Sequence, residues 1–150
     1  MIRQIIEIEE GFRAHPYLCS EGFVTIGYGT KLHDKKGQNP NDFSLVVSED
    51  AAFALLKDKV SYIKTRLMSG RHSRTYQGLS QNRKDILVSM AYQLGTSGLY
   101  NFKKMWAALA EQDYDTASVE MMDSRWAKQT PERARRHADA IDWDTLEEYK

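Results

Sequence analysis

Hydrophobic residues near the N-terminus first follow a helical spacing and then a strand spacing. They recur at i, i+3 and i+4 over residues 2–10, which predicts a short amphipathic helix. Gly11 comes next and suits the left-handed conformation that ends many helices. Residues 14–19 and 23–28, joined by the turn sequence SEG, then predict a β-hairpin with Gly22 in its turn.

Helical spacing dominates the rest of the chain. Residues 33–43 are polar and contain Gly and Pro, which predicts a loop. Beyond them, the apolar pattern predicts a long helix that starts after an N-cap at Ser48 and ends near Gly70. A later helix is expected to break at GTSG, residues 95–98. Further helices are predicted after Ser80, over 102–109, over 117–122 and from Thr130, a cap followed by Pro131. The predicted architecture is α+β: a small sheet-bearing lobe, a long helix and a helical lobe.

Composition limits the class of protein. A chain of 150 residues with 41% hydrophobic and 28% charged residues suffices for one domain, or for two small lobes that share a core. The longest apolar run, at 51–56, is far too short to cross a membrane, so no membrane insertion is expected. Glutamates at positions 7, 9 and 10 interrupt the apolar core that a secretory signal needs, which indicates synthesis in the cytoplasm. A single cysteine excludes an internal disulfide.

Charge is balanced overall but uneven along the chain. The 21 basic residues match 21 acidic ones, which argues against a nucleic-acid-binding protein. Residues 125–136 carry five basic groups against Glu132, and residues 137–150 carry five acids against Lys150. Two interpretations are open: two solvated helix faces that compensate each other, or a basic patch for an anionic polymer.

Three residues in the first part of the chain are candidates for chemistry. Glu10 is predicted in the last turn of a helix, where the dipole disfavours a carboxylate unless a cation or a function compensates. A glutamate near apolar walls has a raised pKa and can act as a general acid. Thr25 lies in the second predicted strand, and Cys19 precedes the polar turn. Gly27 and Gly29 weaken that strand, which indicates that another group approaches its backbone closely.

Together these residues resemble a known family. Glu10 with Gly11, the position of Cys19 and the run TIGYG at 25–29 are similar to the phage-type lysozymes of glycoside hydrolase family 24. Three later segments match the same family: AYQLGTSG at 91–98, DSRWAKQTPERARR at 123–136 and WDTLEEYK at 143–150. The resemblance covers nearly the whole chain, and the loop at 33–43 matches least.

The resemblance implies a lysozyme-like α+β fold with a cleft between two lobes. Residues 12–58 would form the N-terminal lobe, and residues 65–150 with helix 1–11 the helical lobe. The implied reaction is cleavage of the β-1,4 bond between N-acetylmuramic acid and N-acetylglucosamine in peptidoglycan, without a cofactor or metal. The expected protein is a monomer whose partner is the peptidoglycan glycan strand. A holin would release it from the host cytoplasm to act on the cell wall in the periplasm.

The resemblance also assigns site residues. Glu10 matches the family's general acid, Thr25 the threonine that helps to position the attacking water, and Arg133 the arginine paired with the glutamate. Gln93 lines up with a cleft residue. By ungapped register, four more residues would border the cleft: Lys31, Tyr92, Met105 and Glu120.

Cys19 departs from the family's commonest pattern, in which this position is aspartate. In one interpretation its thiolate replaces the carboxylate that activates or orients water on the far face of the sugar. An unperturbed thiol has a pKa of about 8.5, so only a few per cent would be ionised at neutral pH. In the other interpretation the thiolate attacks the anomeric carbon, which gives a covalent intermediate and retention. The unchanged spacing favours the first.

Two other functions fit part of the pattern. A non-catalytic peptidoglycan-binding module would keep the aromatic and basic residues but would not need Glu10, Thr25 and Arg133. A cysteine-dependent amidase or endopeptidase would use His15 with Cys19, although nucleophilic cysteines usually sit at helix N-termini. The four histidines show no spacing typical of metal ligands.

Overall fold

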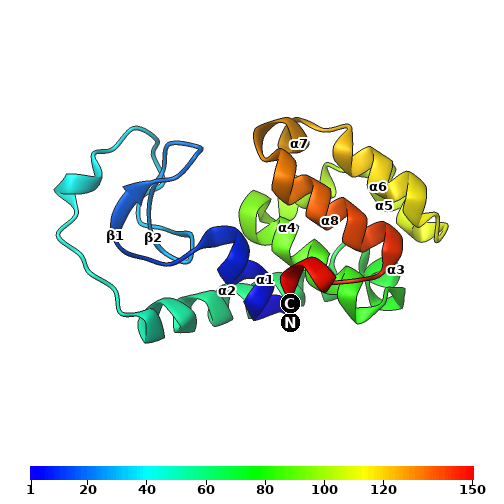
Figure 1. The fold of residues 1–150 in the computed structure, drawn as a ribbon, viewed down its shortest axis with the longest axis horizontal. Coiled ribbons are helices and arrows are strands. Elements are labelled where there is room, and N and C mark those ends of the chain that lie inside the picture. The colour runs from blue at the N-terminus through cyan, green and yellow to red at the C-terminus, as the bar shows by residue number, and fades with distance from the viewer. The chain divides into compact units, whose positions relative to one another are not determined.

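The computed structural model describes residues 1–150 and shows a mixed α+β fold (Figure 1). Most of the chain is helical, and its sheet has three short antiparallel strands near the N-terminus. The predicted fold class is therefore confirmed. The chain divides into two compact units, residues 3–61 with Met1 and residues 62–150 with Ile2. The lobe boundaries expected from the family resemblance, and the cleft, stay predictions.

The first unit begins with the predicted helix and hairpin. Helix α1 (Ile2–Glu10) ends at Gly11, whose φ of 66° is a conformation that glycine adopts without strain. Glu10 is thus the last residue of the helix, as predicted. Gly22 lies in the hairpin turn with a φ of 85°. The strands follow in the spatial order β1 (Arg13–Leu18), β2 (Val24–Gly27) and β3 (Thr30–Lys31). The third strand was not expected, because two residues are too few to show alternation.

A loop and a long helix follow the sheet. Residues 33–43 are irregular except for one short 3-10 turn, η1 (Pro40–Asp42), so the loop prediction is confirmed. Helix α2 (Glu49–Ser69) has the predicted length. The side-chain oxygen of Ser48 accepts a hydrogen bond of 3.1 Å from the backbone N–H of Ala51, which confirms the predicted N-cap.

Strand β2 lies against the first turn of α2. A Cβ atom added to Gly27 would be 3.0 Å from the Cβ of Ala52, and the φ of Gly27 is 66°. Next to it, the hydroxyl of Tyr28 donates a hydrogen bond of 3.0 Å to the carboxylate of Glu49. The predicted close approach at Gly27 is confirmed, and it fixes how the hairpin sits on the helix.

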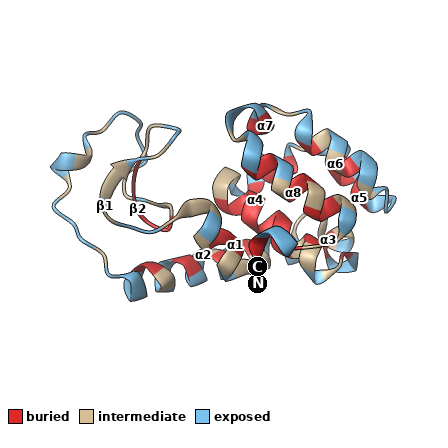
Figure 2. Ribbon diagram, viewed as in Figure 1, coloured by how far each residue is buried: buried red, intermediate tan, exposed pale blue.

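The second unit is helical. Helix α8 packs against α4, α6 and α7, and α5 packs against α6 (Figure 1). Buried positions concentrate on α4 and on one face of α8 (Figure 2). No helix combines the length and the apolar character needed to span a bilayer. The elements are α3 (Ser73–Gly78), α4 (Gln81–Tyr100), α5 (Lys103–Ala110), α6 (Tyr114–Met122), α7 (Arg125–Gln129), α8 (Pro131–Trp143) and the 3-10 turn η2 (Glu147–Tyr149).

One prediction about the helix ends is confirmed and one was wrong in part. The predicted break at GTSG is confirmed at Gly95, whose φ of 77° and ψ of 161° are not helical, and a helix resumes after this kink. Pro131 does start α8, but the hydroxyl of Thr130 makes no cap, because it donates to the carbonyl of Trp126 instead. The short helices α3 and α7 were not expected, since fewer than two turns show no clear helical period.

Candidate active site

Glu10 and Cys19 both lie near Tyr17 in the first unit. Burial raises the pKa of Tyr17, the charge of Glu10 adds to this, Arg13 opposes it and Cys19 raises it further. Both candidate residues are therefore within electrostatic reach of one phenol. Arg13 also lies over the ring of Tyr17, with 4.5 Å from its guanidinium carbon to the ring centroid. The structure thus gathers a carboxylate and a thiol around one side chain of β1.

Cys19 is held by the backbone of the hairpin turn. Its N–H donates a hydrogen bond of 2.9 Å to the carbonyl of Phe23, and its carbonyl accepts one of 2.9 Å from the N–H of Gly22. The side chain is partly exposed. A closed turn of this kind fixes the direction of the thiol while leaving it accessible to solvent.

Thr25 lies on the central strand and contacts the same turn. It is only 2% exposed, and its hydroxyl donates to the Phe23 carbonyl at 2.9 Å, the same oxygen that accepts from Cys19. The Cα of Thr25 is paired with that of Tyr17 on β1 and with that of Lys31 on β3. The three candidates Cys19, Thr25 and Lys31 therefore belong to one small piece of sheet and turn.

This turn favours the ionised form of the thiol. Burial alone raises the pKa of Cys19, but hydrogen bonds from the backbone N–H groups of Phe23 and Glu21 and from the Thr25 hydroxyl outweigh it. Repulsion from the Glu21 carboxylate opposes the shift, and the net result is a pKa below the ordinary value. Hydrogen-bond donors here take the place of the nearby cation that a thiolate would otherwise need.

Arg133 is buried in the second unit and bonded to α4. Its Nη2 donates hydrogen bonds of 3.1 Å to the carbonyl of Ser89 and of 3.2 Å to the Ser89 hydroxyl. The arginine is 7% exposed and Ser89 is fully buried. Its guanidinium is thus fixed within this unit, and its pairing with Glu10 stays a prediction.

Gln93 is fixed by an indole. Its side-chain oxygen accepts a hydrogen bond of 2.8 Å from Nε1 of Trp126, so the amide has one defined orientation. The neighbouring Tyr92 is 3% exposed. A ring so deeply buried contributes to the core of this unit, and its expected role at the cleft border stays a prediction.

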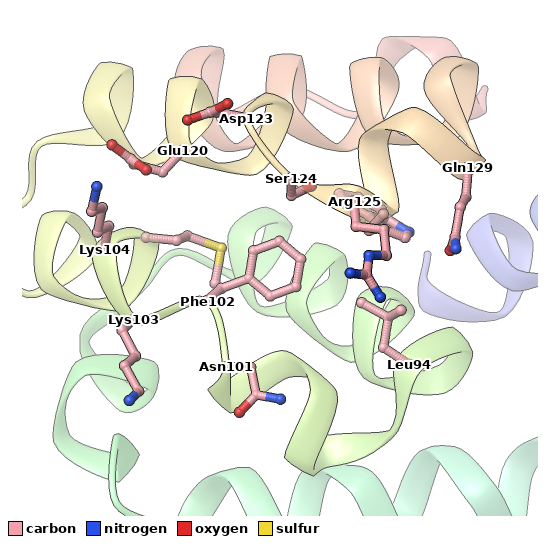
Figure 3. Close-up of a pocket in the computed structure, with 12 residues that line it drawn as sticks. Leu94, Asn101, Phe102, Lys103, Lys104, Glu120, Asp123, Ser124, Arg125 and Gln129 are labelled. Carbon is pink, nitrogen blue, oxygen red and sulfur yellow. The ribbon is translucent and has the colours of Figure 1, made fainter.

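The second unit contains a pocket of about 550 Å³, within the range of small-ligand sites (Figure 3). Met105 and Glu120, two of the residues expected from register, both line it. In the close-up, Arg125 points toward Leu94, and Glu120 lies away from them, near Lys104. Apolar side chains and charges of both signs therefore meet in one hollow. The remaining lining residues are Asn101, Phe102, Lys103, Asp123, Ser124, Trp126 and Gln129.

Two basic residues of the segment 125–136 are engaged within the protein. Arg135 contacts Asp139 at 2.8 Å and both oxygens of Glu148 at 2.9 Å, and Arg133 is buried. Two of the five basic residues of 125–136 are thus unavailable to an external polymer, which favours the compensated-faces interpretation. No group of three or more His, Cys, Asp and Glu side chains is arranged to hold a metal ion.

Comparison with known proteins shows which family this sequence belongs to. The sequence profile described as phage lysozyme matches residues 7–139. That range contains every candidate site residue named above. The chain belongs to the phage lysozyme family.

Several curated relatives carry related names. The probable T4-type lysozyme 2 of Dictyostelium discoideum is 30% identical, over 99% of this chain and 98% of its own length. An endolysin of Acyrthosiphon pisum secondary endosymbiont phage 1 is 26% identical, over 83% of this chain and 75% of its own. The pre-baseplate central spike protein Gp5 of Enterobacteria phage T4 is 25% identical over 97% of this chain, which matches only 28% of that larger protein. The family therefore occurs both as separate proteins and as part of a larger one.

Sequence reasoning missed much of the pocket in this phage lysozyme family member. Its lining includes Asp123, Ser124, Arg125, Trp126 and Gln129. All five belong to the segment DSRWAKQTPERARR, which supported the family resemblance and offered a basic patch over 125–136 as one interpretation, but none of the five was named as a site residue. The high density of family-matching residues in this segment was the signal that could have indicated the pocket. Tyr17 gave none, because a tyrosine in a strand is commonplace.

Proposed function

We propose that this protein is a lysozyme that hydrolyses the β-1,4 bond between N-acetylmuramic acid and N-acetylglucosamine. Family membership supports the reaction class. The observation that carries the proposal is the hairpin turn that lowers the pKa of Cys19, together with Glu10, which lies near the same Tyr17. Two ionisable groups at a sugar-cleaving site are what glycoside hydrolysis requires.

In the proposed mechanism each group has one role. Glu10 donates its proton to the glycosidic oxygen as the bond to the anomeric carbon breaks. The thiolate of Cys19 takes a proton from the water that attacks that carbon from the opposite face, which inverts its configuration. Thr25 helps to position the water. Direct attack by Cys19 would instead retain the configuration, so the product anomer distinguishes the two routes.

The other candidate residues have proposed roles in binding and orientation. Arg133 would pair with Glu10 and keep it in place between turnovers. Gln93 would contact the glycan strand. Four further residues are proposed to border the substrate: Lys31, Tyr92, Met105 and Glu120. The same proposal includes a monomer made in the host cytoplasm, which reaches periplasmic peptidoglycan after a holin opens the membrane and so lyses the host.

The deciding experiment measures new reducing ends released from purified peptidoglycan. Glu10→Gln is expected to lower the rate by about a hundredfold or more, because general acids contribute this much. Glu9→Gln is the matched control: it makes the same change one position earlier on α1 and should stay within about threefold of the unaltered protein.

Each alternative gives a different result in the same assay. Binding of peptidoglycan without any release of reducing ends would show a binding module and contradict the proposal. Release of new amino groups without reducing ends would show an amidase or endopeptidase. Equal rates for Glu10→Gln and the unaltered protein would remove Glu10 from the mechanism.

A further inference from the structure

A buried chain of polar side chains connects α8, α4 and the C-terminal turn η2. The Nε2 atom of His137 lies 2.8 Å from the hydroxyl of Ser89, and its Nδ1 atom lies 2.8 Å from the hydroxyl of Tyr149. The same serine accepts from Arg133, through its carbonyl and its hydroxyl oxygen. His137 and Ser89 are 0% exposed and Tyr149 is 1% exposed.

The imidazole in this chain is neutral at neutral pH. Burial lowers the pKa of His137 well below its ordinary value, and the charges of Arg133 and Arg136 lower it further. A hydrogen bond with the backbone carbonyl of Arg133 opposes the shift without reversing it. A neutral ring has one N–H donor and one acceptor nitrogen. Whether one nitrogen donates or accepts therefore determines what the other nitrogen does.

One arrangement of protons is consistent with the contacts among Arg133, Ser89, His137 and Tyr149. Arg133 donates to the Ser89 oxygen. The serine hydroxyl then donates to Nε2 of His137, and the ring carries its own proton on Nδ1, which faces Tyr149. In this arrangement the orientation of the serine hydroxyl, and with it one of the two bonds that hold the guanidinium, depends on the imidazole.

We propose that His137 is a positioning residue for Arg133 and acts on it through Ser89. Arg133 and His137 are four residues apart on α8, so both side chains face α4. The inference rests on the proposed function, in which Arg133 pairs with Glu10.

The same imidazole also contacts the group that holds Gln93. The ring of Trp126 meets it edge-on with the centroids 5.9 Å apart, and this indole donates to Gln93. Well-packed apolar side chains at this place would cost less folding free energy than buried polar ones. Any buried polar group that lacks a hydrogen bond destabilises the protein. The retained polar groups converge on one cation, which is the expected result if their role is to orient it.

The test uses Ser89→Ala, His137→Phe and the double variant in the reducing-end assay. Each single change is expected to lower kcat by about tenfold with KM within about twofold, since remote misplacement affects the reaction more than binding. The double variant should be no slower than the slower single variant, because both changes break one link. The profile of kcat against pH should also change, since Arg133 would no longer be held where the proposed function pairs it with Glu10.

Two variants separate positioning from folding. His137→Gln keeps a donor and an acceptor and should recover most of kcat. His72→Gln is the matched histidine control: His72 stacks on Trp106, with centroids 4.4 Å apart, and lies outside the chain of polar groups. If His137→Phe does not fold, the kcat and KM of Ser89→Ala alone provide the test.

Three results would overturn the inference. Variants that lose thermal stability but keep the unaltered kcat and pH profile would show a purely structural network. Independent, multiplicative losses in the double variant would show that His137 does not act through Ser89. An unaltered protein that releases no reducing ends would instead overturn the proposed function, and this inference with it.

Discussion

At the scale of single residues, the proposed chemistry of Cys19 depends on its ionisation. The turn lowers its pKa, because hydrogen bonds to the sulfur outweigh burial. Ionisation measured by thiolate absorbance should therefore have its midpoint at a lower pH than that of a free cysteine measured in the same way. If the thiolate accepts the proton from water, the rate of reducing-end release should rise with pH through that same midpoint.

Substitution separates this role from passive occupancy. Cys19→Ser should lower the rate about a hundredfold or more, about 2.7 kcal/mol of barrier, and should remove the rise with pH. Cys19→Asp introduces the carboxylate that the family resemblance implies at this position and should keep activity, with its dependence on pH moved to the acid range of a carboxylate. Near-equal rates for Cys19→Ser and the unaltered protein would show that the thiol has no part in the reaction.

Thr25 offers a test of the cause of the lowered pKa. Thr25→Val keeps the buried shape but removes the hydroxyl that donates in this turn. The pKa of Cys19 should rise in this variant, and the free energy of unfolding should fall by about 1 kcal/mol, a typical value for one hydrogen bond. Thr25→Ser retains a hydroxyl and should leave the thiol pKa unchanged. A pKa that is the same in both variants would contradict the assignment.

The residues that could be predicted are those with local signals. Glu10 stands at a helix end marked by Gly11, and Cys19 stands before a turn marked by Gly22. Ser89 and His137 had no such signal, because the contact between them joins positions 48 residues apart. Hydrophobic periodicity indicates which face of an element is buried. It does not indicate which polar residue contacts that face.

At the scale of elements, the contact between β2 and α2 depends on Gly27. Gly27→Ala brings its new Cβ to 3.0 Å from that of Ala52 and also adopts a positive φ, so it should destabilise the protein by more than about 1 kcal/mol. Gly37→Ala is the control, because Gly37 has a φ of 77° but no atom within 4 Å of the added Cβ. Chemical denaturation of both variants measures the difference. Equal losses would mean that backbone strain alone, and not the close approach, constrains Gly27.

Elements were predictable where the pattern was long or punctuated. Helix α2 spans 21 residues with a regular apolar spacing from Phe53 to Leu67, and it begins at a cap that is formed as expected. Helix α4 continues past GTSG because its core positions resume on the far side of Gly95, where Leu99 is fully buried. The glycine signal therefore marked a real break in the helix, and the burial of Leu99 explains why a helix resumes beyond it.

At the scale of the whole molecule, the uneven charges of the C-terminal part meet within one unit. Arg135 on α8 binds Glu148 beside η2, so the acidic tail lies against the basic helix. The bond lowers the pKa of Glu148, although both groups are exposed and contribute little to stability. Neutral net charge therefore reflects local compensation, and any attraction to an anionic wall must come from the basic residues that remain.

The free energy of unfolding at acid pH should depend on the buried His137. The unfolded chain protonates this imidazole below about pH 6.5, whereas the folded chain does not, because the pKa of His137 is well below that value. The unfolded state then binds more protons, so the free energy of unfolding should fall with pH below 6.5 by up to about 1.4 kcal/mol per unit. His72, whose pKa burial also lowers, adds a contribution that every His137 variant retains. Denaturant titrations at several pH values should therefore show a shallower slope for His137→Gln. An identical slope in both proteins would mean that the folded state accepts this proton, which contradicts a neutral imidazole in the buried chain.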